Sequence, residues 1–123
     1  MQPLALVLYE KLLPGTQLVN RLQDLGWRVQ TLNDEAALTR SAEEHKPMLV
    51  LADLLSTRRN ITEGIAELRQ HPQTKHIPVI AFTAESEQKV FDAALAAGAT
   101  VVVSDTAILQ HLNQVIEQAL SDF

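Results

Sequence analysis

Residues 48–53 read Met-Leu-Val-Leu-Ala-Asp, and residues 77–83 read Ile-Pro-Val-Ile-Ala-Phe-Thr. Each is an apolar run too short for a helix, and each stops at a polar residue. Such runs are typical of strands in a parallel sheet, because helices cover both faces of that sheet. Residues 4–8 and 99–103 have the same character. The sequence therefore predicts four strands buried on both faces.

Helices are predicted between and after these strands. Over residues 17–25 apolar side chains recur at spacings of three and four before Gly26, which is typical of an amphipathic helix with a glycine stop. Pro14-Gly15-Thr16 is expected to break the chain before this helix, and residues 27–32 to form a fifth, more exposed strand. Further helices are expected over residues 33–44, 60–70, 85–97 and 108–120, the last capped by Ser104 or Asp105.

The predicted elements alternate as strand and helix five times. That order indicates a parallel sheet with helices on both faces, and right-handed crossovers leave few topologies. We expect an α/β fold, a flavodoxin-like (βα)5 three-layer sandwich whose five-stranded parallel sheet has the order 2-1-3-4-5. Residues 1–123 are expected to form a single domain.

Composition excludes several functional classes. The chain has no cysteine, so thiolate chemistry and disulfide scaffolds are excluded. Its net charge is -5, and its 10 Lys and Arg residues are scattered, with only Arg58-Arg59 adjacent, which argues against nucleic-acid binding. Its N-terminus lacks the pattern of a signal peptide, and no apolar stretch is long enough to cross a bilayer. We expect a cytoplasmic protein, not membrane-bound, that docks on other proteins.

Polar residues follow the predicted strands at the edge where such sheets bind ligands. They are Tyr9 and Glu10 after the first strand, Asp53 after the third, Thr83 after the fourth and Asp105 after the fifth. The four histidines show no zinc-ligand spacing, and the chain has no P-loop, Gly-x-Ser-x-Gly or Gly-x-Gly-x-x-Gly motif. The residues thus indicate a carboxylate-rich rim and no known enzyme site.

In these segments the chain resembles the CheY-like receiver domains of response regulators in two-component signalling. Residues 48–55 and 77–84 are similar to the third and fourth strands of that family, and Leu-Ala-Ala-Gly-Ala at 95–99 to the end of its fourth helix. Thirty residues separate Asp53 from Thr83, as in the family. The resemblance covers essentially the whole chain.

The resemblance implies a role for each rim residue. Asp53 falls on the phosphoacceptor, Thr83 on the hydroxyl that contacts the phosphoryl group, and Glu10 with Asp53 on positions that bind Mg²⁺. Two positions depart from the family pattern. Tyr9 stands where one acid of the metal-binding pair is expected, and Asp105 stands where a lysine is expected. The sequence thus indicates an atypical receiver, or pseudo-receiver, in which Mg²⁺ binding is doubtful.

The substitution at Asp105 has an electrostatic consequence. Two unit charges about 4 Å apart near a protein surface interact by roughly 4 kcal/mol, so replacing a cation by an anion opposes a phosphoryl group by several kcal/mol. Tyr9 is expected to cover the former metal pocket with its ring. One alternative is that Asp53 is an inherited carboxylate that caps its loop. A separate alternative is that Glu10, Asp53 and Asp105 hold a divalent cation through their oxygens.

Three functions remain open at this stage. The leading hypothesis is a non-enzymatic module that signals by protein-protein interaction without phosphorylation. The first alternative is a working response regulator that receives a phosphoryl group on Asp53 in a phosphorelay. The second is a flavodoxin-like protein that binds a small ligand or a divalent metal. The expected partners are a histidine kinase, an output protein or a second copy, the last through the face between the fourth and fifth helices.

Overall fold

The computed structural model describes residues 3–9, 12–32, 37–54, 61–83 and 88–121. Five parallel strands form one sheet in the order β2-β1-β3-β4-β5, as predicted. The strands are β1 (Leu4–Leu8), β2 (Arg28–Leu32), β3 (Leu49–Asp53), β4 (Val79–Thr83) and β5 (Val101–Ser104). The flavodoxin-like fold class is confirmed.

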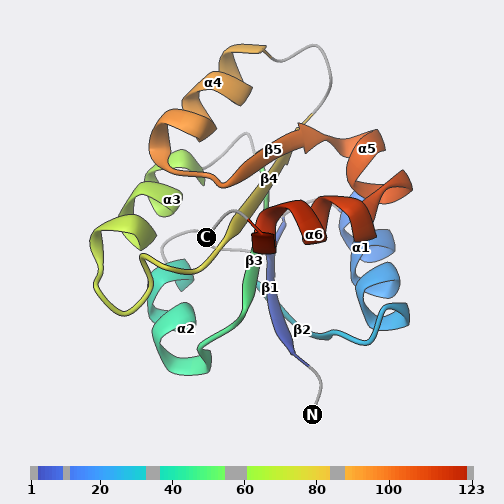
Figure 1. Ribbon diagram of the computed structural model, residues 1–123, viewed down its shortest axis with the longest axis horizontal. Coiled ribbons are helices and arrows are strands. Elements are labelled where there is room, and N and C mark those ends of the chain that lie inside the picture. The colour runs from blue at the N-terminus through green and yellow to red at the C-terminus, as the bar shows by residue number, and fades with distance from the viewer. Residues whose placement is uncertain (1–2, 10–11, 33–36, 55–60, 84–87, 122–123) are drawn as a thin grey trace.

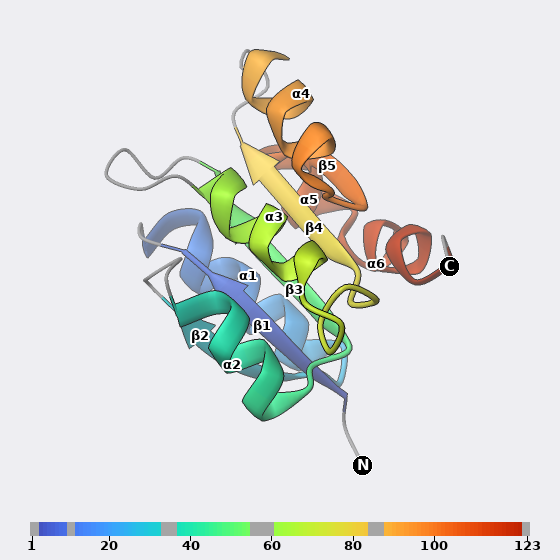
Figure 2. The same ribbon diagram turned by 90° about the vertical axis from the view of Figure 1, so that its left-hand side faces the viewer.

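Helices cover both faces of this sheet (Figures 1 and 2). On one side lie α1 (Leu12–Asp24), α5 (Asp105–Gln110) and α6 (Leu112–Ser121). On the other side lie α2 (Leu38–His45), α3 (Ile61–Gln70) and α4 (Gln88–Ala97), which face the viewer in Figure 2. The three layers follow from the apolar strands, because a sheet that is apolar on both faces must be covered twice.

Alternate residues of each strand point into two separate cores. Every residue of β3 and β4 is buried, whereas β2 at the edge is largely exposed, as its mixed sequence predicted. The core beneath α1, α5 and α6 includes Ala5, Val7, Leu18, Leu22, Trp27, Leu49, Leu51, Ile80, Phe82, Ile108 and Ile116. The core beneath α2, α3 and α4 includes Leu6, Leu8, Leu38, Val50, Ala52, Ile65, Leu68, Val79, Ala81 and Ala94.

The predicted break at Pro14-Gly15-Thr16 is wrong. These residues lie inside α1, which begins at Leu12. Proline is tolerated there because the N–H groups of the first turn have no acceptor within the helix. Gly15 has a packing reason instead: a Cβ built on it would lie 2.6 Å from Cγ of the Tyr9 ring and closer still to another ring carbon. Sequence reasoning missed this contact, because Pro-Gly is usually a turn signal.

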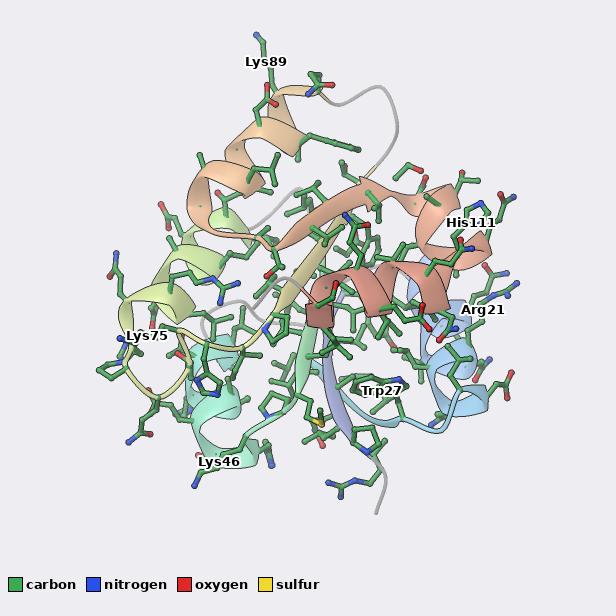
Figure 3. The ribbon with its side chains drawn as sticks, in the orientation of Figure 1. Arg21, Trp27, Lys46, Lys75, Lys89 and His111 are labelled. Atoms are coloured by element: carbon green, nitrogen blue, oxygen red, sulfur yellow. The ribbon has the colours of Figure 1, made fainter. Side chains whose placement is uncertain are left out.

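The single last helix predicted over residues 108–120 is also wrong. The structure has two helices, α5 and α6, which meet at His111, where φ is -125° and ψ is 32°. Ser104 starts α5 early, because its Oγ accepts a hydrogen bond from the N–H of Ala107 at 3.0 Å. His111 lies at the bend (Figure 3). The bend turns Leu112, Val115 and Ile116 onto the sheet, where all three are buried.

Other predicted boundaries fit the structure where it describes them. Helix α3 ends at Gln70, just before His71-Pro72, and α4 ends at Ala97, just before Gly98. The predicted helix starts at Asn33, Asn60 and Glu85 lie outside the described residues. Within the described ranges, no helix has the length and hydropathy needed to cross a membrane.

Candidate functional site at the carboxyl ends of the strands

The strand register brings the predicted residues to one rim of the sheet. Asp53 ends β3 opposite Phe82, and Thr83 ends β4 opposite Ser104. Leu8 pairs with Ala52, so Tyr9 follows in the position next to Asp53. Glu10 lies outside the described residues. The carboxyl ends of β1, β3, β4 and β5 therefore meet at one rim, as the sequence predicted.

Asp53 is almost completely buried, with 2% of its surface exposed. Val7 and Leu51 belong to the core beneath α1, and strand side chains alternate, so Tyr9 and Asp53 are directed toward that same side. A carboxylate at so low an exposure depends on polar neighbours, because burial of an isolated charge is costly. Because only 2% of its surface is exposed, a reagent in solution has little access to Asp53.

Thr83 is fully buried, and its hydroxyl has no hydrogen-bond partner in the described part of the chain. Val79 and Ala81 belong to the core beneath α2, α3 and α4, so Thr83 is directed to that face of the sheet. Buried hydroxyls are nearly always paired. An unpaired hydroxyl at the rim is therefore a position where a ligand oxygen would be favourable.

Tyr9 occupies the place of one expected metal-binding acid. Its backbone N–H donates to the carbonyl of Leu32 at 3.0 Å, and its half-buried ring packs on the core beneath α1 and against Gly15. The ring therefore fills space between β1 and the first turns of α1. That this ring covers a former metal pocket stays a prediction.

Asp105 stands where the resemblance places a lysine, and the structure makes it the first residue of α5. Its Oδ1 accepts a hydrogen bond from the N–H of Thr106 at 2.8 Å. The prediction that Ser104 or Asp105 caps the last helix is thus confirmed for Ser104 at α5. A carboxylate in the first turn of a helix is stabilised by the positive end of the helix dipole.

The described residues do not form a metal centre. Within the ranges that the structure describes, no group of three or more His, Asp or Glu side chains is placed to hold a metal ion. The proposed set of Glu10, Asp53 and Asp105 depends on Glu10, which those ranges do not include. Nδ1 of His71 lies 3.3 Å from Oε1 of Glu43, far from the rim in the sequence.

This arrangement can be compared with known proteins. The model of the response regulator receiver domain family matches residues 14–117 of the chain. The chain belongs to this family. The matched span of this receiver includes Asp53, Thr83 and Asp105 and begins after Tyr9. The search of curated proteins found no match to the chain.

Solved structures confirm the receiver fold. The receiver domain of the sensor histidine kinase PA1611 from Pseudomonas aeruginosa PAO1 superposes with a TM-score of 0.88 at 21% sequence identity. The superposition covers 99% of this chain and 100% of that chain. That structure carries a magnesium ion in its active-site cleft. The chemotaxis protein CheY4 of Vibrio cholerae gives 0.85 at 19%, over 98% and 100%. The NtrX receiver domain of Brucella abortus gives 0.83 at 21%, over 97% and 99%.

Two surface hollows of this receiver lie away from the rim. One of about 360 Å³ is lined by the end of α2 and the loop between α3 and β4, including Glu43, Lys46 and His76. Another of about 250 Å³ is lined by α1, α5 and α6, including Arg21, Leu109 and Asn113. None of the predicted rim residues lines either hollow.

Proposed function

We propose that this receiver signals by binding other proteins, and that its conformation is set by a partner without phosphorylation of Asp53. The observation that carries the proposal is the state of Asp105. The carboxylate stands where a lysine would offset a phosphoryl group, and its Oδ1 is bound to the N–H of Thr106. The rim therefore carries a carboxylate at the position where the resemblance places a lysine.

The electrostatics of the rim support this proposal. A phosphorylated aspartate carries about two negative charges and needs cations beside it. An effective dielectric near 20 gives an interaction of roughly 4 kcal/mol for unit charges about 4 Å apart, so Asp105 opposes phosphorylation where a lysine would favour it. The desolvation of Asp53, which is 2% exposed, adds to this cost.

The donor set that remains is also a poor fit for Mg²⁺. Mg²⁺ favours an octahedral shell of oxygens that includes one or two carboxylates. Tyr9 supplies an aromatic ring packed on Gly15 in place of a carboxylate, and Asp105 is turned to its own helix. The proposed function of this receiver therefore does not depend on Mg²⁺.

A protein partner has an exposed apolar anchor to bind. Leu95 on α4 is 53% exposed, and the neighbouring strand β5 presents the half-buried Val102 and Val103. Receivers of known function act through histidine kinases and output proteins, and we propose a partner of one of these kinds, or a second copy, on the α4–β5–α5 face. We also propose a cytoplasmic, non-enzymatic role. The net charge of -5 argues against nucleic-acid binding.

One observation favours the alternative, a phosphoacceptor in a phosphorelay. The buried hydroxyl of Thr83 has no partner in the described chain, and a phosphoryl oxygen at the carboxyl ends of the strands would supply one if it reached the face of the sheet to which Thr83 is directed. The structural relative PA1611 holds magnesium in its cleft with the same fold. Asp53 and Thr83 are residue types that the family resemblance leads us to expect at their positions, whereas Tyr9 and Asp105 are not.

Amide NMR spectra with Mg²⁺, and then with Mg²⁺ and beryllofluoride, distinguish these functions. We expect no beryllofluoride-dependent shifts around Asp53, Thr83 and β5 in the natural sequence. The double variant Tyr9→Asp, Asp105→Lys restores the expected acid and cation, and should gain such shifts. Adding Asp53→Asn to the double variant should abolish them.

The natural sequence itself provides the decisive outcome. Shifts that saturate with beryllofluoride and vanish in Asp53→Asn would reject our proposal and establish the phosphorelay function. If the double variant responds and the natural sequence does not, the two substituted positions account for the loss. If the double variant also fails to respond, the residues at positions 9 and 105 do not account for the loss, and the electrostatic argument for our proposal is wrong.

A further inference from the structure

The hollow of about 360 Å³ lies at the opposite end of the sheet from the rim. Its lining comes from two segments, Glu43, Lys46 and Pro47 at the end of α2, and Gln73, His76 and Ile77 between α3 and β4. These segments precede β3 and β4 in the chain, so the hollow lies at the amino ends of both strands. Its volume is within the range of about 300–1,000 Å³ that is usual for small-molecule sites.

One wall of this hollow, the loop of residues 71–77, is fixed by its own hydrogen bonds. Thr74 is fully buried, and its hydroxyl donates to the carbonyl of Leu68 at 2.7 Å. The N–H of Lys75 donates to the carbonyl of His71 at 2.9 Å, and the N–H of Ile77 to that of Thr74 at 3.1 Å. A wall that is ordered before binding spares a ligand the entropic cost of ordering it.

Arg69, in the last turn of α3, holds the same loop from behind. One terminal nitrogen donates to the carbonyls of Lys75 and Ile77 at 2.8 and 2.6 Å. Its Nε donates to the carbonyl of Gly98 at 2.8 Å, and its other terminal nitrogen to Oγ1 of Thr100 at 3.0 Å. Burial lowers the pKa of Arg69, although a guanidinium stays protonated in proteins. Because each nitrogen has an acceptor, this cation fixes the wall and is not offered to a ligand.

The other wall ends in a lysine with an uncommon backbone conformation. Lys46 has a φ of 48° and a ψ of 58°, and its N–H donates to the carbonyl of Ala42 to end α2. In the described part of the chain it is the only residue other than glycine with a positive φ. Glycine or asparagine is favoured at such a helix end, because a longer side chain strains the left-handed backbone. Residues held in this way are concentrated at functional sites.

The hollow carries two opposite charges that are not paired with each other. Glu43 and Lys46 both line it. Oε1 of Glu43 lies 3.3 Å from Nδ1 of His71 instead, and Oε2 has no hydrogen-bond partner among the described residues. The exposed ammonium of Lys46 forms no ion pair within those residues either. Figure 3 shows Lys46 at the end of α2, on the same side of the molecule as Lys75.

The bottom of the hollow is apolar. Pro47 is buried, and Ile77 has only 2% of its surface exposed. Gln73 and His76 are exposed and add polar side chains at the edge. Small-molecule sites commonly combine an apolar surface with a few polar groups that fix the orientation of the ligand.

We propose that this hollow binds a free α-amino acid with a small aliphatic side chain, as its zwitterion. The ligand carboxylate pairs with Lys46, the ligand ammonium donates to Oε2 of Glu43, and the side chain contacts Pro47 and Ile77. A simple anion would be repelled by Glu43 and a simple cation by Lys46, whereas a zwitterion is attracted by both. The site is separate from the rim, because none of the rim residues lines it.

Amide NMR titrations of the full chain with L-alanine, L-valine and L-leucine test the site. We expect saturable shifts at residues 43–48 and 73–77 with at least one of the three, and none around Asp53 and Thr83. The N-acetyl derivative of the best ligand lacks the ammonium, and its amide lacks the carboxylate. Each should bind about tenfold more weakly, the change that corresponds to losing one hydrogen bond to a charged group.

Charge-removing variants assign the two ends of the ligand. Glu43→Gln should weaken the amino acid about tenfold and should not weaken its N-acetyl derivative, which has no ammonium to lose. Lys46→Gln should weaken the amino acid by a similar factor and leave its amide unchanged. Glu44→Gln and Lys75→Gln are the matched controls, because both residues are exposed nearby and do not line the hollow. Neither control should change any affinity.

Lys46→Gly separates binding from folding. Glycine adopts a φ of 48° without strain, so this variant should unfold at a higher urea concentration and still lose the amino acid. A variant that is more stable and binds as well as the natural sequence would show that the lysine is not part of a site.

Two results of the titrations would overturn the proposal. The first is the absence of saturable shifts at residues 43–48 and 73–77 with all three amino acids. The second is equal binding of the amino acid, its N-acetyl derivative and its amide, which would mean that the hollow does not recognise a zwitterion. Neither result affects the proposed function, because that function is tested at the rim with beryllofluoride.

Discussion

The two ends of β4 and β5 satisfy their polar groups in opposite ways. At the amino ends, Arg69 is half-buried and each guanidinium nitrogen donates to an acceptor, while Oγ1 of Thr100 accepts two hydrogen bonds. At the carboxyl ends, the hydroxyl of Thr83 is buried and has no partner in the described chain. The amino ends are therefore built for stability, and the carboxyl ends keep a group that only a ligand or a conformational change would satisfy.

The placement of charge differs as well. At the amino ends a half-buried cation, Arg69, donates hydrogen bonds to carbonyls. At the carboxyl ends the family position for a cation is Asp105, which is bound to the start of α5. Among the described residues, strong polar contacts therefore fix the junction of α4 with β5, whereas Asp105 adds negative charge at the rim.

The largest expected effect comes from removing the arginine. Arg69→Met keeps most of the stem but leaves the acceptors of Gly98, Lys75, Ile77 and Thr100 without their donor. We expect a loss of about 3 kcal/mol in the free energy of unfolding, since hydrogen bonds to charged groups contribute more than neutral ones. Urea denaturation measures this, with Arg40→Met as the control. A loss below about 1 kcal/mol would show that the hydrogen bonds of Arg69 contribute little to the stability of the receiver.

A smaller loss of stability is expected from changing the glycine on which Arg69 packs. Comparison with a second glycine separates the cost of the positive φ from the cost of the contact with Arg69. Gly98→Ala must adopt a φ of +114° and meets Cγ of Arg69, whereas Gly26→Ala must adopt +93° with nothing within 4 Å. We expect losses of roughly 2 kcal/mol for Gly98→Ala and roughly 1 kcal/mol for Gly26→Ala. Thermal or urea unfolding compares the two. Equal losses would mean that the contact with Arg69 is relieved at no cost.

The same substitution at the two ends of the strands should have opposite signs. Thr100→Val removes an oxygen that accepts hydrogen bonds from Val79 and Arg69, and should cost about 2 kcal/mol. The measurement is again the midpoint and slope of urea unfolding. A neutral result would show that water replaces the hydroxyl at this half-buried position.

The smallest change is a gain. Thr83→Val replaces an unpaired buried hydroxyl by a methyl group of similar shape, and should stabilise the receiver by about 1 kcal/mol. A loss of stability would show that the hydroxyl has a partner in solution, and the contrast between the two ends would then disappear. The valine variant also serves in the beryllofluoride experiment, because removal of Thr83 should weaken any phosphoryl-like contact.

Local sequence was sufficient for much of the rim and insufficient for its details. Asp53 and Thr83 could be placed because each ends an apolar run, and parallel strands bring their carboxyl ends together. The contact of Tyr9 with Gly15 could not be predicted, because Pro-Gly has the local pattern of a turn. Neither could the bend at His111, because residues 108–120 keep a helical spacing of apolar side chains on both sides of it.

Arg69 shows the limit of sequence reasoning most clearly. It lies on a helix among polar residues, and nothing in its neighbourhood distinguishes it from an exposed arginine such as Arg40. Its acceptors come from residues 75, 77, 98 and 100, which converge only when α3, α4 and β5 are packed. Gly98 predicted the end of a helix, but nothing in the sequence predicted that Arg69 packs against it.

The sequence by itself determined the alternation of strand and helix, the two apolar faces of the sheet and the substituted residues at positions 9 and 105. These follow from period and composition, which are local. The tertiary structure alone decided which polar groups are satisfied: Arg69 at one end of β4 and β5 has its acceptors, and Thr83 at the other has none in the described chain. Hydrogen bonding between distant segments depends on distance and direction, and packing sets both.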